Sequence, residues 1–200
     1  ASRSFITDLK DEEVSVVENA ATRPADELTR LQTGVQFVVA INEAPELGNR
    51  HEGVSRLEAV MEHLQTWSGS QKATSTDDLS LAGNNGLQFV RLANPSEWIQ
   101  ALQTYQPNLL TARAGLVSLN SGLDLATDPN PNPFMKRALL YITPLPATAD
   151  LPTFTDLASR ARQLGVQVSV WLVAGANAEA TNAVAVDALR RRLLVSALLA

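Results

Sequence analysis

Apolar and polar positions alternate along the chain in blocks that predict strands and helices in turn. Val35–Ile41 is an almost unbroken apolar run, typical of a central parallel strand buried on both faces. The runs at 137–143 and 166–173 have the same character and predict further buried strands. After the first run, apolar residues recur at helical spacing, at Val54, Leu57, Val60, Met61 and Leu64. The pattern therefore alternates between strand and helix periods.

Shorter segments extend the alternation. We expect strands at 14–17, 79–82 and 87–92, the last two joined by the turn Gly83–Gly86. Further helices are expected around 98–105, 116–126, 154–164 and 183–199. Their order predicts an α/β fold with an open, doubly wound, mainly parallel sheet and helices on both faces.

Helix ends and connectors follow from single residues. Ser96 is expected to cap the helix that contains Trp98, and Gly165 is expected just after the end of its helix. The polar segment 20–33 predicts a connector with one helical turn at most. Asp128–Pro133 contains three prolines and predicts a loop, either a recognition surface or a spacer.

Composition narrows the function classes. The chain is 45% hydrophobic, as in ordinary globular proteins, and has no cysteine, which excludes disulfides, thiolate metal sites and a cysteine nucleophile. Its net charge is -5 and its only basic cluster is Arg190–Arg192, so we expect no nucleic-acid partner. No apolar run approaches the roughly 18 residues that span a bilayer, so direct membrane insertion is not expected.

Four segments together resemble the von Willebrand factor type A (vWA) family. Phe37–Glu46 resembles its first strand and Asp-x-Ser-x-Ser loop, and Arg137–Pro144 is similar to its strand ending in Thr-Asp-Gly. Leu119–Ala126 and Leu157–Ala174 resemble two of its helices, the latter with the closing strand. The resemblance covers about 33–180 and implies a vWA-like domain at 34–200, preceded by a strand and connector segment at 1–33.

The resemblance also implies where the family's divalent cation would bind. It places the first Asp at Asn42, the two Ser at Ala44 and Glu46, the Thr at Val117 beside Ser118, and the last Asp at Pro144. Hard cations need a full set of oxygen ligands, so we expect the metal site to be lost and no cofactor to bind. The prolines at 45 and 144 indicate stiffened loops, read either as a metal-free binding rim or as loops shaped for stability.

A protein partner is expected on this rim. The candidate partner-binding residues are Asn42, Glu43, Ala44, Pro45, Glu46, Ser118, Asn120 and Pro144.

Signals for catalysis are weak. His51 and His63 are not spaced as metal ligands and are read as solvated. Asp77–Asp78 and the pair Asp124 and Asp128 are read as turn carboxylates, although paired carboxylates can do acid–base chemistry. The sequence contains neither a Gly-x-Ser-x-Gly elbow nor a Gly-rich phosphate loop. We therefore expect no enzyme; a hydrolase on a Rossmann-like sheet is the least supported class.

The resemblance implies protein–protein recognition or adhesion in a bacterial envelope or extracellular protein. The alternative is an intracellular vWA-like adaptor for an ATPase assembly; a signal peptide upstream of Ala1 would distinguish the two. Self-association is also expected, because the predicted helix at 183–199 carries more apolar residues than one buried stripe needs. These residues are Leu189, Leu193, Leu194, Leu198 and Leu199. In the family a further strand follows this helix, and none is expected here.

Overall fold

The computed structural model describes residues 10–24, 33–71, 76–128, 134–144, 150–174 and 194–199. The chain divides into two compact units, Ala1–Gln32 and Thr33–Ala200.

The first unit contains a hairpin. A short 3-10 helix, Asp11–Glu13, precedes β1 (Ser15–Glu18), which pairs antiparallel with β2 (Ala21–Pro24). The turn residues Asn19 and Ala20 both have positive φ, at 50° and 64°, as a two-residue hairpin turn requires. The strand expected at 14–17 is confirmed to within a residue. The expectation of a connector is wrong at 21–24, which form β2.

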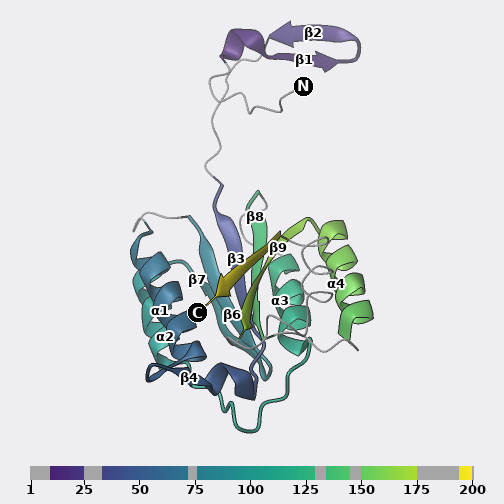
Figure 1. The fold of residues 1–200 in the computed structure, drawn as a ribbon. Coiled ribbons are helices and arrows are strands. Elements are labelled where there is room, and N and C mark those ends of the chain that lie inside the picture. The colour runs from purple at the N-terminus through teal and green to yellow at the C-terminus, as the bar shows by residue number, and fades with distance from the viewer. Residues whose placement is uncertain are drawn as a thin grey trace. The chain divides into compact units, whose positions relative to one another are not determined.

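The second unit is built on one six-stranded sheet with the order β10-β9-β8-β3-β6-β7 (Figure 1). Only β6 and β7 pair antiparallel; all other neighbours are parallel. The strands are β3 (Val35–Ile41), β6 (Asp78–Gly83), β7 (Gly86–Leu92), β8 (Lys136–Thr143), β9 (Val166–Ala174) and β10 (Leu194–Leu199). The predicted doubly wound, mainly parallel α/β fold is confirmed.

Among the described residues, two helices pack against each face of the sheet, and Figure 1 shows the two pairs on opposite sides of it. They are α1 (Arg56–Gly69) and α2 (Pro95–Thr104) on one face, and α3 (Val117–Thr127) and α4 (Leu151–Gln163) on the other. Between β3 and α1 lie the 3-10 helix η2 (Pro45–Gly48) and the short strands β4 (Arg50–His51) and β5 (Val54–Ser55). None of the described helices is long and apolar enough to cross a membrane.

Helix ends follow local chemistry, with one correction. Ser55 and Glu58 form a capping box at the start of α1, and Gly165 has φ +67° after α4, as expected. The cap of α2 is Asn94 rather than Ser96: its Oδ1 accepts from the Ser96 N–H at 2.9 Å. Pro95 sets a helical φ, so the helix starts before the expected cap.

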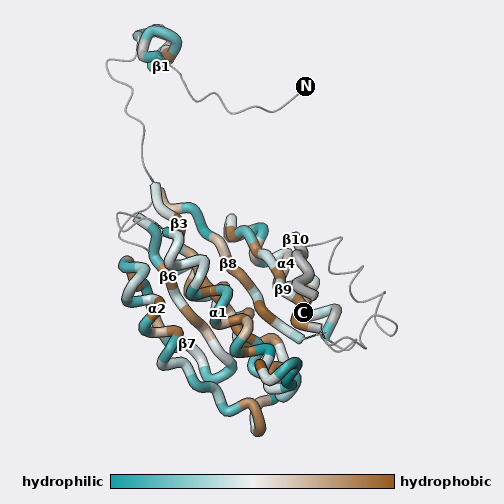
Figure 2. The backbone as a smooth tube through the Cα atoms, turned by 60° about the vertical axis from the view of Figure 1, so that its left-hand side comes forward, coloured by the Kyte–Doolittle hydropathy of each residue, from teal (hydrophilic) through white to brown (hydrophobic). Residues whose placement is uncertain are grey.

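The core has one layer on each side of the sheet. On the α3–α4 side, Gly122 lets α3 lie close, because a Cβ there would be 2.9 Å from Leu139 Cδ1 and 3.1 Å from Ala40 Cβ. On the α1–α2 side, Trp98 is fully buried and packs with Leu64 and Leu102. The central strands β3 and β8 carry hydrophobic stretches that these two layers share (Figure 2).

The C-terminal prediction needs correction. Leu194–Leu199 form a strand rather than the end of a helix, with Leu194 paired to Ser169 and Leu199 to Ala174. Residues 183–193 of the expected helix lie outside the described residues. A short apolar run suits either structure by periodicity, and the parallel edge of β9 offers it backbone hydrogen bonds. A further strand, which we expected to be missing, is therefore present. Leu194, Leu198 and Leu199 belong to this strand, so they are not part of the expected apolar helix face.

Candidate functional site

The parallel strands β3 and β8 end at one edge of the sheet, where the segments after α2 and before α3 also lie (Figure 1). We call residues 42–48, 105–120 and 143–144 the rim. In open α/β sheets the loops beyond the carboxyl ends of the strands form the usual binding surface.

Asn42 ties three parts of the rim together from a buried position, with 3% exposure. Its Oδ1 accepts from the Gly115 N–H at 3.0 Å and its Nδ2 donates to Thr143 Oγ1 at 2.9 Å. Its backbone N–H donates to the Ile142 carbonyl at 2.8 Å, across from β3 to β8. The Thr143 hydroxyl then donates to the Pro144 carbonyl at 2.8 Å. The side chain of Asn42 therefore holds the loop before α3 against the ends of two strands.

Glu43 is also buried, with 3% exposure, and faces the opposite layer. Its Oε1 accepts from the Tyr105 hydroxyl at 2.5 Å. Burial is the main reason that the pKa of Tyr105 is raised, and the hydrogen bond and charge of Glu43 add to it. Tyr105 thus remains a neutral donor at physiological pH.

Gly83, the last residue of β6, and Asn84, in the turn that follows, complete this inner cluster. A Cβ at Gly83 would lie 2.2 Å from Glu43 Oε1, so only glycine leaves room for the carboxylate. Asn84 Nδ2 donates to the carbonyls of Glu43, at 2.7 Å, and Arg113, at 3.0 Å. Sequence reasoning assigned these two residues to a turn alone and missed Tyr105, Gly115 and Thr143.

The eight predicted rim residues divide by exposure. Ala44, Ser118 and Pro144 are buried along with Asn42 and Glu43, and Ser118 Oγ has no hydrogen-bond partner among the described residues. Pro45, Glu46 and Asn120 are exposed. Asn120 Oδ1 accepts from Arg160 Nη1 at 2.8 Å, which links α3 to α4. The buried residues shape the rim, and the exposed ones form part of its surface.

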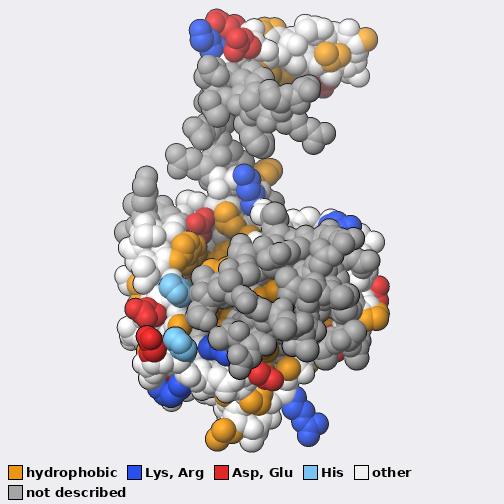
Figure 3. Space-filling model, in the orientation of Figure 1, with side chains coloured by type: hydrophobic (Ala, Val, Ile, Leu, Met, Phe, Trp, Pro, Cys, Tyr) orange, Lys and Arg blue, Asp and Glu red, His pale blue; other side chains and the backbone are white. Residues whose placement is uncertain are grey.

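The rim also exposes apolar side chains that the sequence analysis did not single out. Leu110 is 93% exposed and Val117 57%. Figure 3 shows hydrophobic side chains at the end of the second unit where this loop lies. Arg113 and Glu46 are exposed on the same rim.

The donors present do not suit a divalent cation. The Asn42 amide is engaged with Gly115 and Thr143, and the Glu43 carboxylate with Tyr105. Ala44, Val117 and Pro144 have no side-chain oxygen. In the described part of the chain, no three His, Asp or Glu side chains are grouped so that they could hold a metal.

The sheet and its helices agree with the vWA fold, and comparison with solved structures supports this assignment. No family model and no curated protein matches the chain. BatB of Bacteroides thetaiotaomicron, described as a conserved hypothetical protein, is similar with TM-score 0.54 and 19% identity, over 70% of this chain and 66% of that one.

Two further structures are similar. An aerotolerance-related membrane protein of Bacteroides fragilis gives TM-score 0.54 and 16% identity over 70% of this chain and 67% of that one. The VWA domain of SpRpn10 is similar with TM-score 0.55 and 11% identity, over 83% of this chain and 88% of that one. The predicted vWA resemblance is thus confirmed for the fold, and this chain spans about two thirds of the length of the two Bacteroides structures.

Proposed function

We propose that this chain is a non-catalytic protein–protein interaction module whose partner docks on the rim without a metal ion. The observation that carries the proposal is the exposure of Leu110 and Val117, at 93% and 57%, on a rim in which the buried side chains of Asn42 and Glu43 are held by hydrogen bonds. Protein interfaces typically combine an apolar centre with polar surroundings. Here Glu46, Arg113 and Asn120 are among the exposed polar residues of the same rim.

The buried titratable groups support binding rather than catalysis. The Glu43 carboxylate is buried in the core, where it accepts a hydrogen bond from the Tyr105 hydroxyl, and a substrate would not reach it. A general base must be within hydrogen-bond reach of the proton it removes. The inner cluster therefore acts as a rigid support.

We further propose that the module belongs to an envelope or extracellular protein and that adhesion is one form its binding takes. The support is the fold likeness to an aerotolerance-related membrane protein. Fractionation of the native protein tests this location; recovery in the cytosolic fraction alone would contradict it and favour the adaptor alternative.

The docking surface is testable with a photo-crosslinking residue at Leu110, at Val117 or, as a control, at Asp156, which is exposed on α4. Crosslinks in native cells should arise at the first two positions and identify the partner. With the purified partner, Leu110→Asp should raise Kd at least tenfold, about 1.4 kcal/mol. Glu46→Lys should change Kd by a smaller factor, and Asp156→Asn should leave it unchanged.

Two outcomes would overturn the proposal. A loss of binding in EDTA, restored by Mg²⁺, would show that a metal ion is needed after all. Unchanged affinity in the Leu110 variant, together with a loss in the α4 variant, would move the interface to the other side of the molecule.

A further inference from the structure

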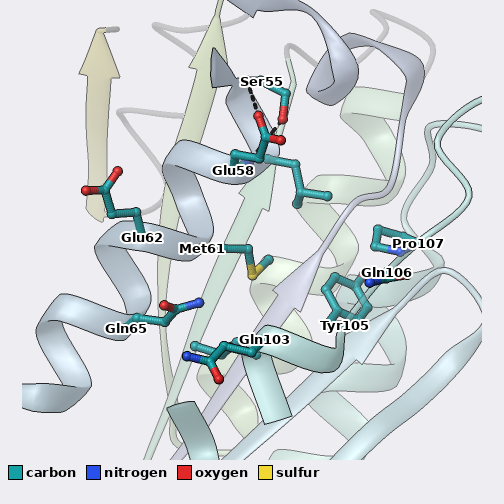
Figure 4. Close-up of a pocket in the computed structure, with 11 residues that line it drawn as sticks. Ser55, Glu58, Met61, Glu62, Gln65, Gln103, Tyr105, Gln106 and Pro107 are labelled. Carbon is teal, nitrogen blue, oxygen red and sulfur yellow. Dashed lines mark hydrogen bonds between the residues drawn. The ribbon is translucent and has the colours of Figure 1, made fainter. Parts of the chain in front are cut away.

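A groove of about 580 Å³ lies between α1 and the end of α2 (Figure 4). Pockets that bind ligands commonly have volumes of this order. The lining residues contributed by α1 and the residue before it are Ser55, Leu57, Glu58, Met61, Glu62 and Gln65; those from the end of α2 onward are Leu102, Gln103, Tyr105, Gln106 and Pro107.

One wall of the groove is acidic. Glu58 and Glu62 are one helical turn apart on α1, and none of the eleven lining residues is basic. The pKa of Glu58 is lowered mainly by the hydrogen bond from the Ser55 backbone N–H, and the Ser55 hydroxyl adds to this effect. Glu58 is therefore charged at neutral pH. Arg50, which does not line the groove, forms an ion pair with Glu58 in which Nη2 and Oε1 are 3.2 Å apart. Glu62 is exposed and makes no ion pair with the described residues. Of the two carboxylates in the groove, that of Glu62 is therefore the one that no described residue pairs with.

The rest of the groove has a different chemistry. Met61 and Leu102 are buried at its floor. Gln65, Gln103 and Gln106 lie around it (Figure 4), and each side-chain amide both donates and accepts hydrogen bonds. Such amides match the alternating N–H and C=O groups of an extended backbone, while the floor suits an aliphatic side chain.

We propose that this groove binds an extended peptide segment of a partner protein in which Lys or Arg is next to an aliphatic residue. The cation lies against Glu62, the aliphatic side chain packs on Met61 and Leu102, and the glutamines bind the peptide backbone. Charge complementarity selects this occupant, because an acidic segment would be repelled by Glu58 and Glu62. The groove shares Tyr105, Gln106 and Pro107 with the rim, but neither Leu110 nor Val117, which carry the proposed docking surface, lines it.

The test uses a fluorescein-labelled peptide of sequence Gly-Leu-Arg-Leu-Gly and its counterpart with Glu in place of Arg. Fluorescence anisotropy with the full chain should show saturable binding of the first and none of the second. Glu62→Gln should weaken binding two- to fivefold, as expected for one solvent-exposed charge. Gln103→Arg should weaken it at least tenfold, and a basic residue in the last turn of α2 is compatible with the helix dipole.

The matched control is Asp156→Asn, which removes one negative charge on the other face of the sheet and should leave affinity unchanged. Amide chemical-shift changes on peptide addition should cluster at 55–65 and 102–107. The proposal fails if neither peptide binds at millimolar concentration, if both bind equally, or if all three variants bind alike. It also fails if the shifts cluster at 108–118, an outcome that would favour the rim as the binding surface for this peptide.

Discussion

Residues 42–44 and residues 45–46 are neighbours in the chain but have opposite surroundings. Asn42, Glu43 and Ala44 are buried, and the two polar side chains among them are held by hydrogen bonds to three distant segments. Pro45 and Glu46 are exposed. The comparison shows that the inner part of this loop extends the core, whereas its outer part is exposed.

The largest expected effect is that of Gly83→Ala in the inner cluster. The added Cβ would overlap Glu43 Oε1, at 2.2 Å, and approach the Tyr105 hydroxyl, at 3.1 Å. Overpacking combined with the loss of a buried hydrogen bond should lower the free energy of unfolding by about 3 kcal/mol, measured by urea titration. Gly69→Ala is the matched control, because nothing lies within 4 Å of its added Cβ, and it should not destabilise. Equal stability of the two variants would show that the inner cluster is not tightly packed.

Tyr105→Phe should have an intermediate effect, about 2 kcal/mol at neutral pH, because Glu43 loses a buried donor. The folded-state pKa of Tyr105 is raised above its ordinary 10.0, so the stabilisation it provides is complete below pH 10 and falls as pH rises further. The wild type should therefore lose stability above pH 10 more steeply than Tyr105→Phe in chemical unfolding across this range.

Tyr141 serves as the comparison for this pH dependence. Burial also raises the pKa of Tyr141, whose hydroxyl donates to the Gly115 carbonyl at 2.9 Å. The fall in the free energy of unfolding above pH 10 should thus be less steep in Tyr105→Phe and in Tyr141→Phe, and least steep in the double variant. Identical slopes in the wild type and Tyr105→Phe would contradict the assignment.

The smallest expected effect lies on the outer part of the rim. Val117 is 57% exposed at the start of α3, so Val117→Ser should change the free energy of unfolding by less than about 0.5 kcal/mol. Its effect should appear in partner affinity instead. A stability loss above about 1 kcal/mol in the same urea titration would place Val117 with the inner cluster and weaken the distinction between the two regions.

Much of the fold could be predicted because strand and helix periods are local properties. The runs that became β3, β8 and β9 were found from apolar continuity, and the family resemblance placed Asn42 and Pro144 directly after the first two of these strands, where the structure has them. The last strand was missed, since 194–199 has no periodicity that separates strand from helix and its pairing with β9 is a tertiary contact.

The sequence by itself determined the alternation of elements and the donor chemistry of the rim, because Ala44, Val117 and Pro144 have no side-chain oxygen in any conformation. Only the tertiary structure decided which rim residues face inward. The partners of Glu43 and Asn42 are Tyr105 and Gly115, which are 62 and 73 positions away in the chain. Burial and hydrogen bonding depend on such distant segments meeting, and no local pattern of residues contains that information.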